Sequence, residues 1–332
     1  MNDKFKAVLI SEKSDKSFKR EIVSRDIEDL PQGDLLIKVK YSSLNYKDAL
    51  SSIGNRGVTR NYPHTPGIDA SGIVVESKSD KFKVHDQVIV TGYDLGMNTS
   101  GGFAEYIRVP ADWAVFLPEK LSLRESMIYG TAGFTAALSV FRLLNSGIKA
   151  GDGEILVTGA TGGVGTSAIS ILNKLGYDVI AATGKLDERE RLINMGAKDI
   201  IDRNELDEDS KKALLKGRWA GVIDTVGGNI LSNAIKSTHY GGSITCCGNV
   251  SSGQLHTSIY PFILKGLSLL GVDSVNCPMD RRLEIWENLS DNWKASYIED
   301  NVEEVSLEEV FHKIDQMLEG KHKGRTIINL EK

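Results

Sequence analysis

The sequence has few cysteines, no excess of basic residues and no long apolar run. Three cysteines in 332 residues are too few for a disulfide framework, and the adjacent Cys246 and Cys247 would point to opposite faces of a strand. The net charge of −5 provides no basic surface for nucleic acid. We therefore expect reduced, structural thiols and no nucleic-acid partner.

No stretch of about 18 apolar residues is present, as a membrane-spanning helix would need. The longest apolar segment, 127–144, is interrupted by small and charged residues and predicts a buried helix. The amino-terminal stretch MNDKFKAVLISEKSDK lacks the apolar core of a signal peptide. We expect a cytoplasmic protein without a membrane partner, and its length and 41% hydrophobic content fit two globular domains.

The most informative stretch is EILVTGATGGVGTSAISILNKLG, residues 154–176. Its apolar start predicts a buried strand and its second half an amphipathic helix. Glycines in the turn between them let a ligand approach the backbone, and the free N–H groups of a helix start attract phosphate. Gly162, Gly163, Val164 and Gly165 are therefore predicted to bind a pyrophosphate. The alternative is an ordinary glycine-rich turn, but the strand-like YDVIAA that follows completes a βαβ unit of about 30 residues.

The end of that second strand indicates which dinucleotide binds. An NAD site usually has an acidic residue there, whereas this chain has Thr183, Gly184 and Lys185. A hydroxyl and a cation suit a 2′-phosphate, which favours NADPH, and Arg203 after the third strand could close over the same phosphate. Alternatively, Thr183 caps the next helix and Lys185 is a solvated charge.

From about Leu121 onward, helices and strands alternate, which predicts a doubly wound parallel sheet. In such sheets ligands bind at the carboxyl ends of the strands. The turns TVGGN and GNVSSG lie at two such ends, so Gly227, Gly248 and Asn249 are candidate cofactor neighbours; the alternative for the glycines is an ordinary turn role. The predicted helices are 131–144, 163–175, 186–195, 207–215 and 229–237, and the predicted strands are 154–158, 178–182, 199–202, 219–224 and 242–247.

Several strings spread over nearly the whole chain occur in one family. They are SSLNYKDAL (42–50), PGID (66–69), GTAGFTAAL (130–138), VTGATGGVG (157–165), TGK (183–185), WAGVIDTVGG (219–228), YGGSITCCG (240–248), PFILKG (261–266) and GVDSV (271–275). The chain thus resembles the zinc-free branch of the medium-chain dehydrogenase/reductase superfamily. Within it, the chain is most similar to quinone oxidoreductases that include bacterial NADPH-dependent acryloyl-CoA reductases.

The resemblance implies an α/β fold with a GroES-like β-rich catalytic domain and a Rossmann domain with a doubly wound parallel sheet. The implied boundaries are 1–121 and 267–332 for the catalytic domain and 122–266 for the Rossmann domain. Asn45, Tyr46 and Asp48 would lie near the nicotinamide as catalytic residues, with Tyr46 also contacting the cofactor; the alternatives are packing for Tyr46 and helix capping for Asp48. Thr135 and Phe262, in two of the matched strings, are further cofactor-binding candidates, with core packing the default for Thr135.

Zinc-dependent relatives need a cysteine and a His-Glu pair, where this chain has Asn45-Tyr46-Lys47-Asp48 and Gly67-Ile68-Asp69. We therefore expect no metal. Hydride from NADPH would then reduce an α,β-unsaturated carbonyl, with an acryloyl-CoA-like enoyl thioester the leading substrate and a quinone the alternative. A further alternative is an NADPH-binding sensor without turnover. The resemblance also implies a homodimer, with residues 267–275 as an apolar strand available for pairing; an internal sheet strand is the alternative.

Overall fold

The computed structural model describes residues 4–295, 299 and 302–332. The chain divides into two compact units, each with its own sheet. Unit 1 comprises Met1–Thr131, Val275–Ser290 and Asn301–Lys332, and unit 2 comprises Ala132–Ser274 and Asp291–Asp300. The main part of unit 2 is therefore inserted between segments of unit 1.

Unit 1 is rich in β structure. Its strands are β1 (Lys4–Glu12), β2 (Phe18–Asp26), β3 (Leu35–Ser43), β4 (Asp69–Ser77), β5 (Gln87–Thr91), β6 (Tyr106–Val109), β7 (Ala114–Phe116), β14 (Val302–Val305) and β15 (Arg325–Asn329). Its helices are α1 (Tyr46–Ser52), α7 (Met279–Ser290) and α8 (Val310–Leu318), with short 3₁₀ turns η1 (Ile27–Asp29) and η2 (Ala111–Trp113).

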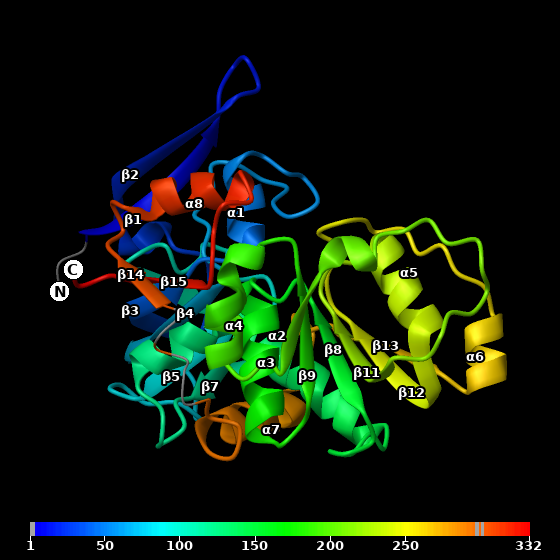
Figure 1. Ribbon diagram of the computed structural model, residues 1–332. Helices are drawn as coiled ribbons and strands as arrows, with labels where there is room; N and C mark the ends of the chain where they lie inside the picture. Colours follow the sequence, from blue (N-terminus) through cyan, green and yellow to red (C-terminus); the bar gives the residue numbers. More distant parts are fainter. Residues whose placement is uncertain (1–3, 296–298, 300–301) are drawn as a thin grey trace. The chain divides into compact units, whose positions relative to one another are not determined.

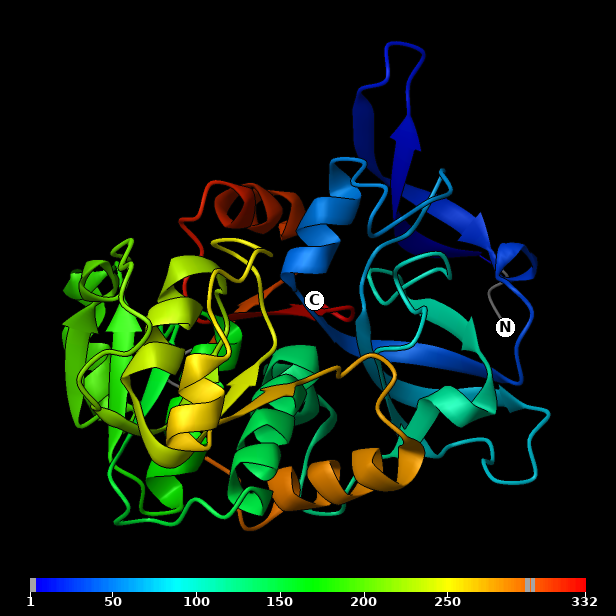
Figure 2. The same ribbon diagram turned by 90° about the vertical axis from the view of Figure 1, so that its right-hand side faces the viewer.

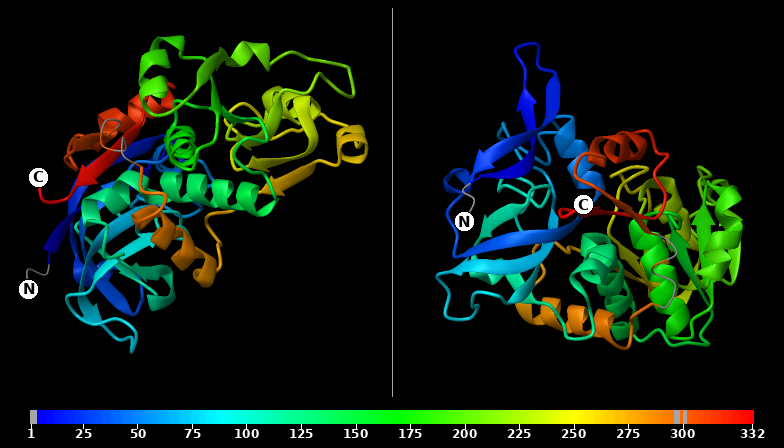
Figure 3. Two further views of the ribbon diagram at one scale, coloured as in Figure 1. Left: turned by 60° about the horizontal axis from the view of Figure 1, so that its bottom comes forward. Right: turned by 90° about the vertical axis from the view of Figure 1, so that its left-hand side faces the viewer.

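The strands of unit 1 form two sheets. β1 and β2 pair as an antiparallel hairpin, seen in blue with its tip projecting from unit 1 (Figure 2). The other strands form a seven-stranded sheet in the order β14-β15-β3-β4-β5-β7, with β6 also pairing β3. β15, late in the sequence, therefore lies beside the early strand β3, the red and blue strands of Figure 3. Residues far apart in the sequence thus meet at the ends of β15, β3 and β4.

The longest helix, α2 (Leu123–Asn145), begins in unit 1 and continues into unit 2. By length and composition alone it is long enough and apolar enough to cross a membrane, but 78% of its most apolar window is buried, as in a core helix. This agrees with the buried helix predicted for 127–144. Its backbone leaves the helical conformation at Gly130, where φ is 50° and ψ is −156°.

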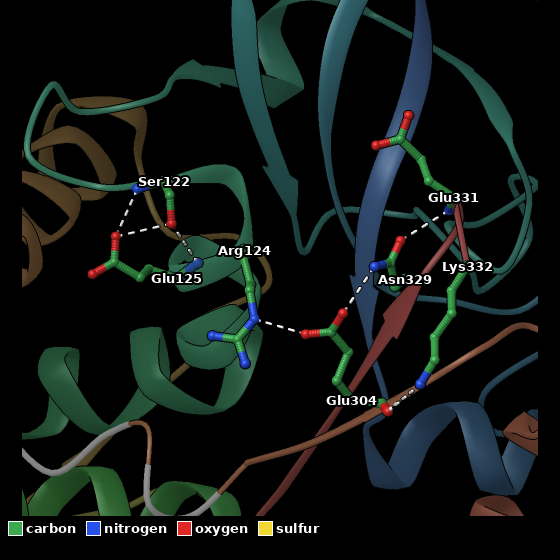
Figure 4. Close-up of polar contacts among 7 residues, drawn as sticks. All are labelled: Ser122, Arg124, Glu125, Glu304, Asn329, Glu331 and Lys332. Atoms are coloured by element: carbon green, nitrogen blue, oxygen red, sulfur yellow. Dashed lines mark hydrogen bonds and ion pairs between the residues drawn. The ribbon is translucent and has the colours of Figure 1, made fainter.

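The first turn of α2 is attached to the strands of unit 1 (Figure 4). The Ser122 N–H donates to the Glu125 carboxylate at 2.8 Å and the Glu125 N–H donates to the Ser122 hydroxyl at 3.1 Å, which is a capping box. Arg124 Nε donates to Glu304 Oε2 on β14 at 2.7 Å, and Asn329 Nδ2 on β15 donates to Glu304 Oε1 at 2.8 Å. The start of α2 is thus held against β14 and β15.

Unit 2 is a parallel sheet with helical connections (Figure 1). The strand order is β10-β9-β8-β11-β12-β13. From the centre of the sheet, β8 to β10 follow one another toward one edge and β11 to β13 toward the other, as in a doubly wound sheet. The central strands β8, β9 and β11 are almost wholly buried, as expected when both faces of a sheet are covered. The strands are β8 (Glu154–Thr158), β9 (Val179–Thr183), β10 (Asp199–Asp202), β11 (Trp219–Asp224), β12 (Thr238–Cys246) and β13 (Ser268–Gly271). The connecting helices are α3 (Gly163–Lys174), α4 (Arg189–Asn194), α5 (Gly228–Ser237) and α6 (Tyr260–Lys265), with 3₁₀ turns η3 (Leu186–Glu188) and η4 (Arg203–Glu205).

The predicted alternation of helices and strands is confirmed, except that the helix predicted for 207–215 is wrong. Side chains of α5 donate hydrogen bonds to backbone carbonyl groups in this segment and just before it. Asn233 Nδ2 donates to the carbonyls of Leu206 (2.8 Å) and Glu208 (2.7 Å), and Lys236 Nζ donates to that of Ser210 (2.7 Å). These bonds satisfy three carbonyl groups without a helix, which propensity alone does not reveal.

The boundaries between the two units differ from those expected from the sequence. β13, expected in the β-rich domain, pairs in parallel with β12 of unit 2 from Ser268 to Gly271. The first boundary follows Thr131 rather than residue 121, because α2 starts within unit 1. The short segment Asp291–Asp300 also belongs to unit 2.

Candidate functional site

The glycine-rich turn of unit 2 connects β8 to α3. Gly162 is the N-cap of α3, so Gly163, Val164 and Gly165 form its first turn, as predicted. A Cβ on Gly165 would lie 2.5 Å from the carbonyl oxygen of Gly159, so the turn can be this tight only with glycine. The free N–H groups of this 12-residue helix face the turn, where an anion is favoured.

A second turn follows β11 and is held by a buried carboxylate. Asp224 Oδ1 accepts a hydrogen bond from the Thr158 hydroxyl at 2.7 Å, and Oδ2 accepts one from the Gly227 N–H at 2.8 Å. Burial raises the pKa of Asp224 to about 6. Sequence reasoning missed both Thr158 and Asp224. The sequence feature that could have identified them is a polar residue at the carboxyl end of each of two neighbouring buried strands.

Gly227 and Gly248 fit close backbone contacts around that turn. A Cβ on Gly248 would lie 2.0 Å from the Thr225 carbonyl oxygen, and one on Gly227, whose φ is +73°, would lie 2.2 Å from that of Ser252. Asn249 next to them is exposed. Since β8 and β11 pair, the structure brings these residues to the same edge of the sheet as the glycine-rich turn.

The end of β9 gathers the residues predicted to select the cofactor. The Thr183 hydroxyl accepts a hydrogen bond from the Lys185 N–H at 3.0 Å, so this side chain shapes the turn, whereas the N-cap of the following η3 is Lys185 and not Thr183. A Cβ on Gly184 would lie 2.7 Å from Arg203 Nε, which shows that the exposed Arg203 side chain lies against Gly184. The Asp202 carboxylate instead accepts from the Asn204 N–H at 2.9 Å. Lys185 and Arg203 therefore bring two cationic residues to the end of β9.

Thr135 and Phe262 have contacts that indicate packing. The Thr135 side chain is buried, and its hydroxyl donates to Ser274 Oγ at 2.8 Å. Phe262 on α6 packs against the hydrophobic core of unit 2. Their assignment as cofactor-binding residues rests on the family resemblance alone.

The predicted catalytic residues form one corner of unit 1, where β3 leads into α1. Asn45 is the N-cap of α1, Tyr46 is its first residue, and Asp48 lies in its first turn. Tyr46 is 48% exposed, whereas Asn45 and Asp48 are buried at 8% and 0%. We therefore assign Asn45 and Asp48 to positioning, and Tyr46 remains the candidate catalytic residue of this corner.

Asp48 ties α1 to the loop before β4. One carboxylate oxygen accepts hydrogen bonds from the N–H groups of Gly67 (2.9 Å) and Ile68 (3.0 Å), and the other accepts from the Asn45 N–H (2.8 Å). Burial raises the pKa of Asp48 to about 7, although the three N–H donors oppose this shift. The capping role considered from the sequence is the one that the contacts show.

Two buried charged residues behind this corner were missed by sequence reasoning. Asp69, at the start of β4, and Arg325, at the start of β15, both contact the hydroxyl of Ser43, at 2.6 and 2.8 Å. Asp69 is 0% and Arg325 4% exposed. No local pattern connects them, because they meet only through the pairing of β15 and β4 with β3.

The residues of unit 2 fit a dinucleotide. The start of α3 leaves backbone N–H groups without intrahelical partners, and Lys185 and Arg203 are cationic residues at the end of β9. Among residues 4–295, 299 and 302–332, no group of three or more His, Cys, Asp or Glu side chains is placed to hold a metal ion.

Two family models match the chain, described as an alcohol dehydrogenase GroES-like domain (residues 31–119) and a zinc-binding dehydrogenase (residues 163–291). A Bacillus subtilis (strain 168) protein, YhfP, is 47% identical over 91% of this chain and 92% of its own length. Its provisional name is quinone oxidoreductase. An Escherichia coli (strain K12) protein, AcuI, is 40% identical over 97% of this chain and 99% of its own, and its provisional name is acrylyl-CoA reductase.

Two solved structures resemble this one closely. The yhdH oxidoreductase of Salmonella enterica, in complex with NADP, has a TM-score of 0.95 at 39% identity, covering 98% of this chain and 99% of its own. The Bacillus subtilis yhfP protein, with NAD bound, has a TM-score of 0.96 at 45% identity, with the same coverage.

The buried carboxyl of Asp48 predicts a specific pH dependence of stability. Because its pKa rises from 3.8 to about 7, the folded protein binds more protons than the unfolded chain between these values. The contribution of Asp48 to the free energy of unfolding is therefore fully present below pH 3.8 and is lost as the pH rises through 7. In urea unfolding, the stability of the wild type relative to Asp48→Asn should fall by about 3 kcal/mol between pH 5 and pH 8.

Asp15→Asn provides the control, since Asp15 is exposed and its pKa is lowered from 3.8, so it does not titrate in this range. A difference between wild type and Asp48→Asn that stays constant from pH 5 to pH 8 contradicts the prediction.

Proposed function

The chain belongs to the medium-chain dehydrogenase/reductase family, and from this we propose that it is an NADPH-dependent reductase of conjugated carbonyl compounds. The leading substrate is an acryloyl-CoA-like enoyl thioester. The observation that carries the choice of cofactor is the end of β9, where Arg203 lies against Gly184 beside Lys185. Two cations suit the extra phosphate of NADPH, whereas the hydroxyls of NAD would favour an acidic residue.

Each part of unit 2 has a distinct task in holding the cofactor. The N–H groups at the start of α3 receive the pyrophosphate, and Gly227, Gly248 and Asn249 line the neighbouring strand ends. Asp224 fixes the turn after β11, so the backbone there keeps its shape when a ligand binds. Bound NADPH supplies the hydride that adds to the β-carbon of the substrate.

Tyr46 is the residue of unit 1 that we propose to act on the substrate. Its exposed hydroxyl can donate a hydrogen bond to the carbonyl oxygen, where negative charge develops as the double bond is reduced. Asn45 and Asp48 keep the start of α1 in place, so the backbone that carries Tyr46 is held for the reaction.

The names of the relatives support two substrate classes. AcuI, which matches this chain over nearly all of its length, favours an enoyl thioester. YhfP, with higher identity, favours a quinone as the second candidate. Both substrates contain a conjugated carbonyl group that a hydride donor and a hydrogen-bond donor can reduce.

The test compares initial rates of NADPH and NADH oxidation at 340 nm with acryloyl-CoA and with a soluble quinone. We expect the highest kcat/KM with acryloyl-CoA and NADPH. Faster turnover of the quinone reassigns the substrate class. If neither substrate is reduced, the reductase proposal fails and a cofactor-binding sensor takes its place.

Lys185→Ala tests the choice of cofactor separately. Loss of a charge-assisted contact with the 2′-phosphate should raise KM for NADPH about tenfold and change KM for NADH less than about twofold. Lys198→Ala is the matched control, because Lys198 pairs with Glu154 and Asp178 near the opposite ends of the strands. Equal effects of Lys185→Ala on both cofactors contradict the assignment.

We also propose that the protein is a homodimer. β13 is the edge strand of the sheet of unit 2, so its outer side is available for pairing with β13 of a second copy. Light scattering should give the mass of two chains, and the mass of one chain contradicts this proposal.

A further inference from the structure

Helix α2 is interrupted at Gly130, and the interruption lies next to the corner that carries Tyr46. At Gly130 the backbone leaves the helical conformation, so the residues before it end one helical half and Thr131 begins the next. The end of a helix leaves carbonyl groups without intrahelical partners, and the start of a helix leaves N–H groups without them. Both sets need partners because Met127 and Ile128 are fully buried and Thr131 is partly buried.

Two buried charges supply these partners, each at the end that suits its sign. Arg325 donates to the carbonyl oxygens of Ile128 (Nε, 2.8 Å) and Met127 (Nη2, 3.3 Å), which end the first half. Asp69 accepts from the Thr131 N–H (2.8 Å) and hydroxyl (2.6 Å), which start the second half. A cation at the carbonyl end and an anion at the N–H end both favour the helix dipole.

The same two side chains hold Asn45, the residue before Tyr46. Asn45 Nδ2 donates to Asp69 Oδ2 at 2.7 Å, and Arg325 Nη1 lies 3.4 Å from Asn45 Oδ1. The Ser43 hydroxyl joins the two charges, since it donates to Asp69 and accepts from Arg325. Both polar atoms of the Asn45 side-chain amide are thus held by hydrogen bonds.

Little space is left for this group to rearrange. A Cβ on Gly130 would lie 2.5 Å from Asp69 Oδ2, 2.5 Å from Ser43 Oγ and 2.7 Å from Arg325 Nη2. Glycine is therefore needed at position 130 for two reasons. It adopts the positive φ without strain, and it leaves room for the three polar atoms. Any change in the bend of α2 displaces the atoms that bind Asn45.

We infer that Asp69 and Arg325 are positioning residues, which set the orientation of Asn45 and Tyr46 and link it to the bend in α2. The inference rests on the proposed function for its effect on turnover, but not for its effect on Tyr46 itself. Displacing a reacting group by about 1 Å lowers rates by as much as about 100-fold. Replacing either side chain, so that its hydrogen bonds are lost, should therefore lower kcat while leaving the cofactor site in unit 2 intact.

The kinetic test uses Arg325→Lys and Asp69→Asn with acryloyl-CoA and NADPH. We expect kcat to fall about 10- to 100-fold, with KM for NADPH changed less than about threefold. In a Tyr46→Phe background, Arg325→Lys should lower kcat less than about threefold, because the residue through which it acts is already altered. An equal loss in both backgrounds contradicts positioning through Tyr46.

Arg282→Lys is the matched control. Arg282 is also a fully buried arginine of unit 1, and it donates to the carbonyls of Thr91 (2.8 Å) and Val275 (3.1 Å). Its replacement tests the general cost of altering a buried arginine. A fall in kcat as large as that of Arg325→Lys, with the same dependence on Tyr46, contradicts a specific role for Arg325.

A second test needs no turnover and therefore holds whatever the substrate is. In ¹⁹F NMR of protein labelled with 3-fluorotyrosine, the resonance that disappears in Tyr46→Phe identifies Tyr46 among the ten tyrosines. We expect this resonance to shift or broaden in Arg325→Lys and Asp69→Asn and to stay unchanged in Arg282→Lys. An unchanged Tyr46 resonance in the folded variants overturns the inference, even if activity is lost.

Ser43→Ala provides a milder variant if Arg325→Lys or Asp69→Asn fails to fold. It removes the hydroxyl between the charges and leaves both of them in place. The Tyr46 resonance should shift in this variant as well. A folded Ser43→Ala protein with an unchanged resonance contradicts the inference.

Discussion

The geometry of unit 1 depends on placing two opposite charges, Asp69 and Arg325, where water does not reach them. A buried charge is tolerated only when hydrogen bonds and an opposite charge compensate it, and removing one partner of such a pair typically costs about 3–5 kcal/mol. Here that compensation comes from β3, from the corner before α1 and from both halves of α2. The hydrogen bonds to these two charges therefore fix where the elements lie. The segment that carries the exposed Tyr46 cannot move without breaking hydrogen bonds to Asp69 or Arg325.

Unit 2 uses the same principle with a single carboxylate. Asp224 lies at the end of a central strand and binds the end of the neighbouring strand and the next turn, so both turns around the dinucleotide site are held from below. In each unit the buried polar groups fix the shape of nearby backbone. Groups held in this way lose little conformational freedom when a ligand binds.

Local features of the sequence are enough to place most of the fold. The glycine-rich turn, the alternation of strands and helices after residue 121 and the cationic end of β9 are read from neighbouring residues, and the structure brings Lys185 and Arg203 to the same corner. The sequence wrongly predicts a helix over 207–215, because carbonyl groups of this segment bind side chains of α5. Asp69 and Arg325 could not be found, because only the pairing of three strands distant in the sequence brings them together.

The insertion of unit 2 within unit 1 has a consequence for the order in which the protein is made. All six strands of the parallel sheet lie between residues 154 and 271, so this sheet can assemble as soon as that stretch has left the ribosome. β15 is translated later, and until Arg325 arrives the carbonyls of the first half of α2 and the amide of Asn45 lack their partner. During synthesis the sheet of unit 2 can thus form first, and the corner that carries Tyr46 is completed only when β15 has emerged.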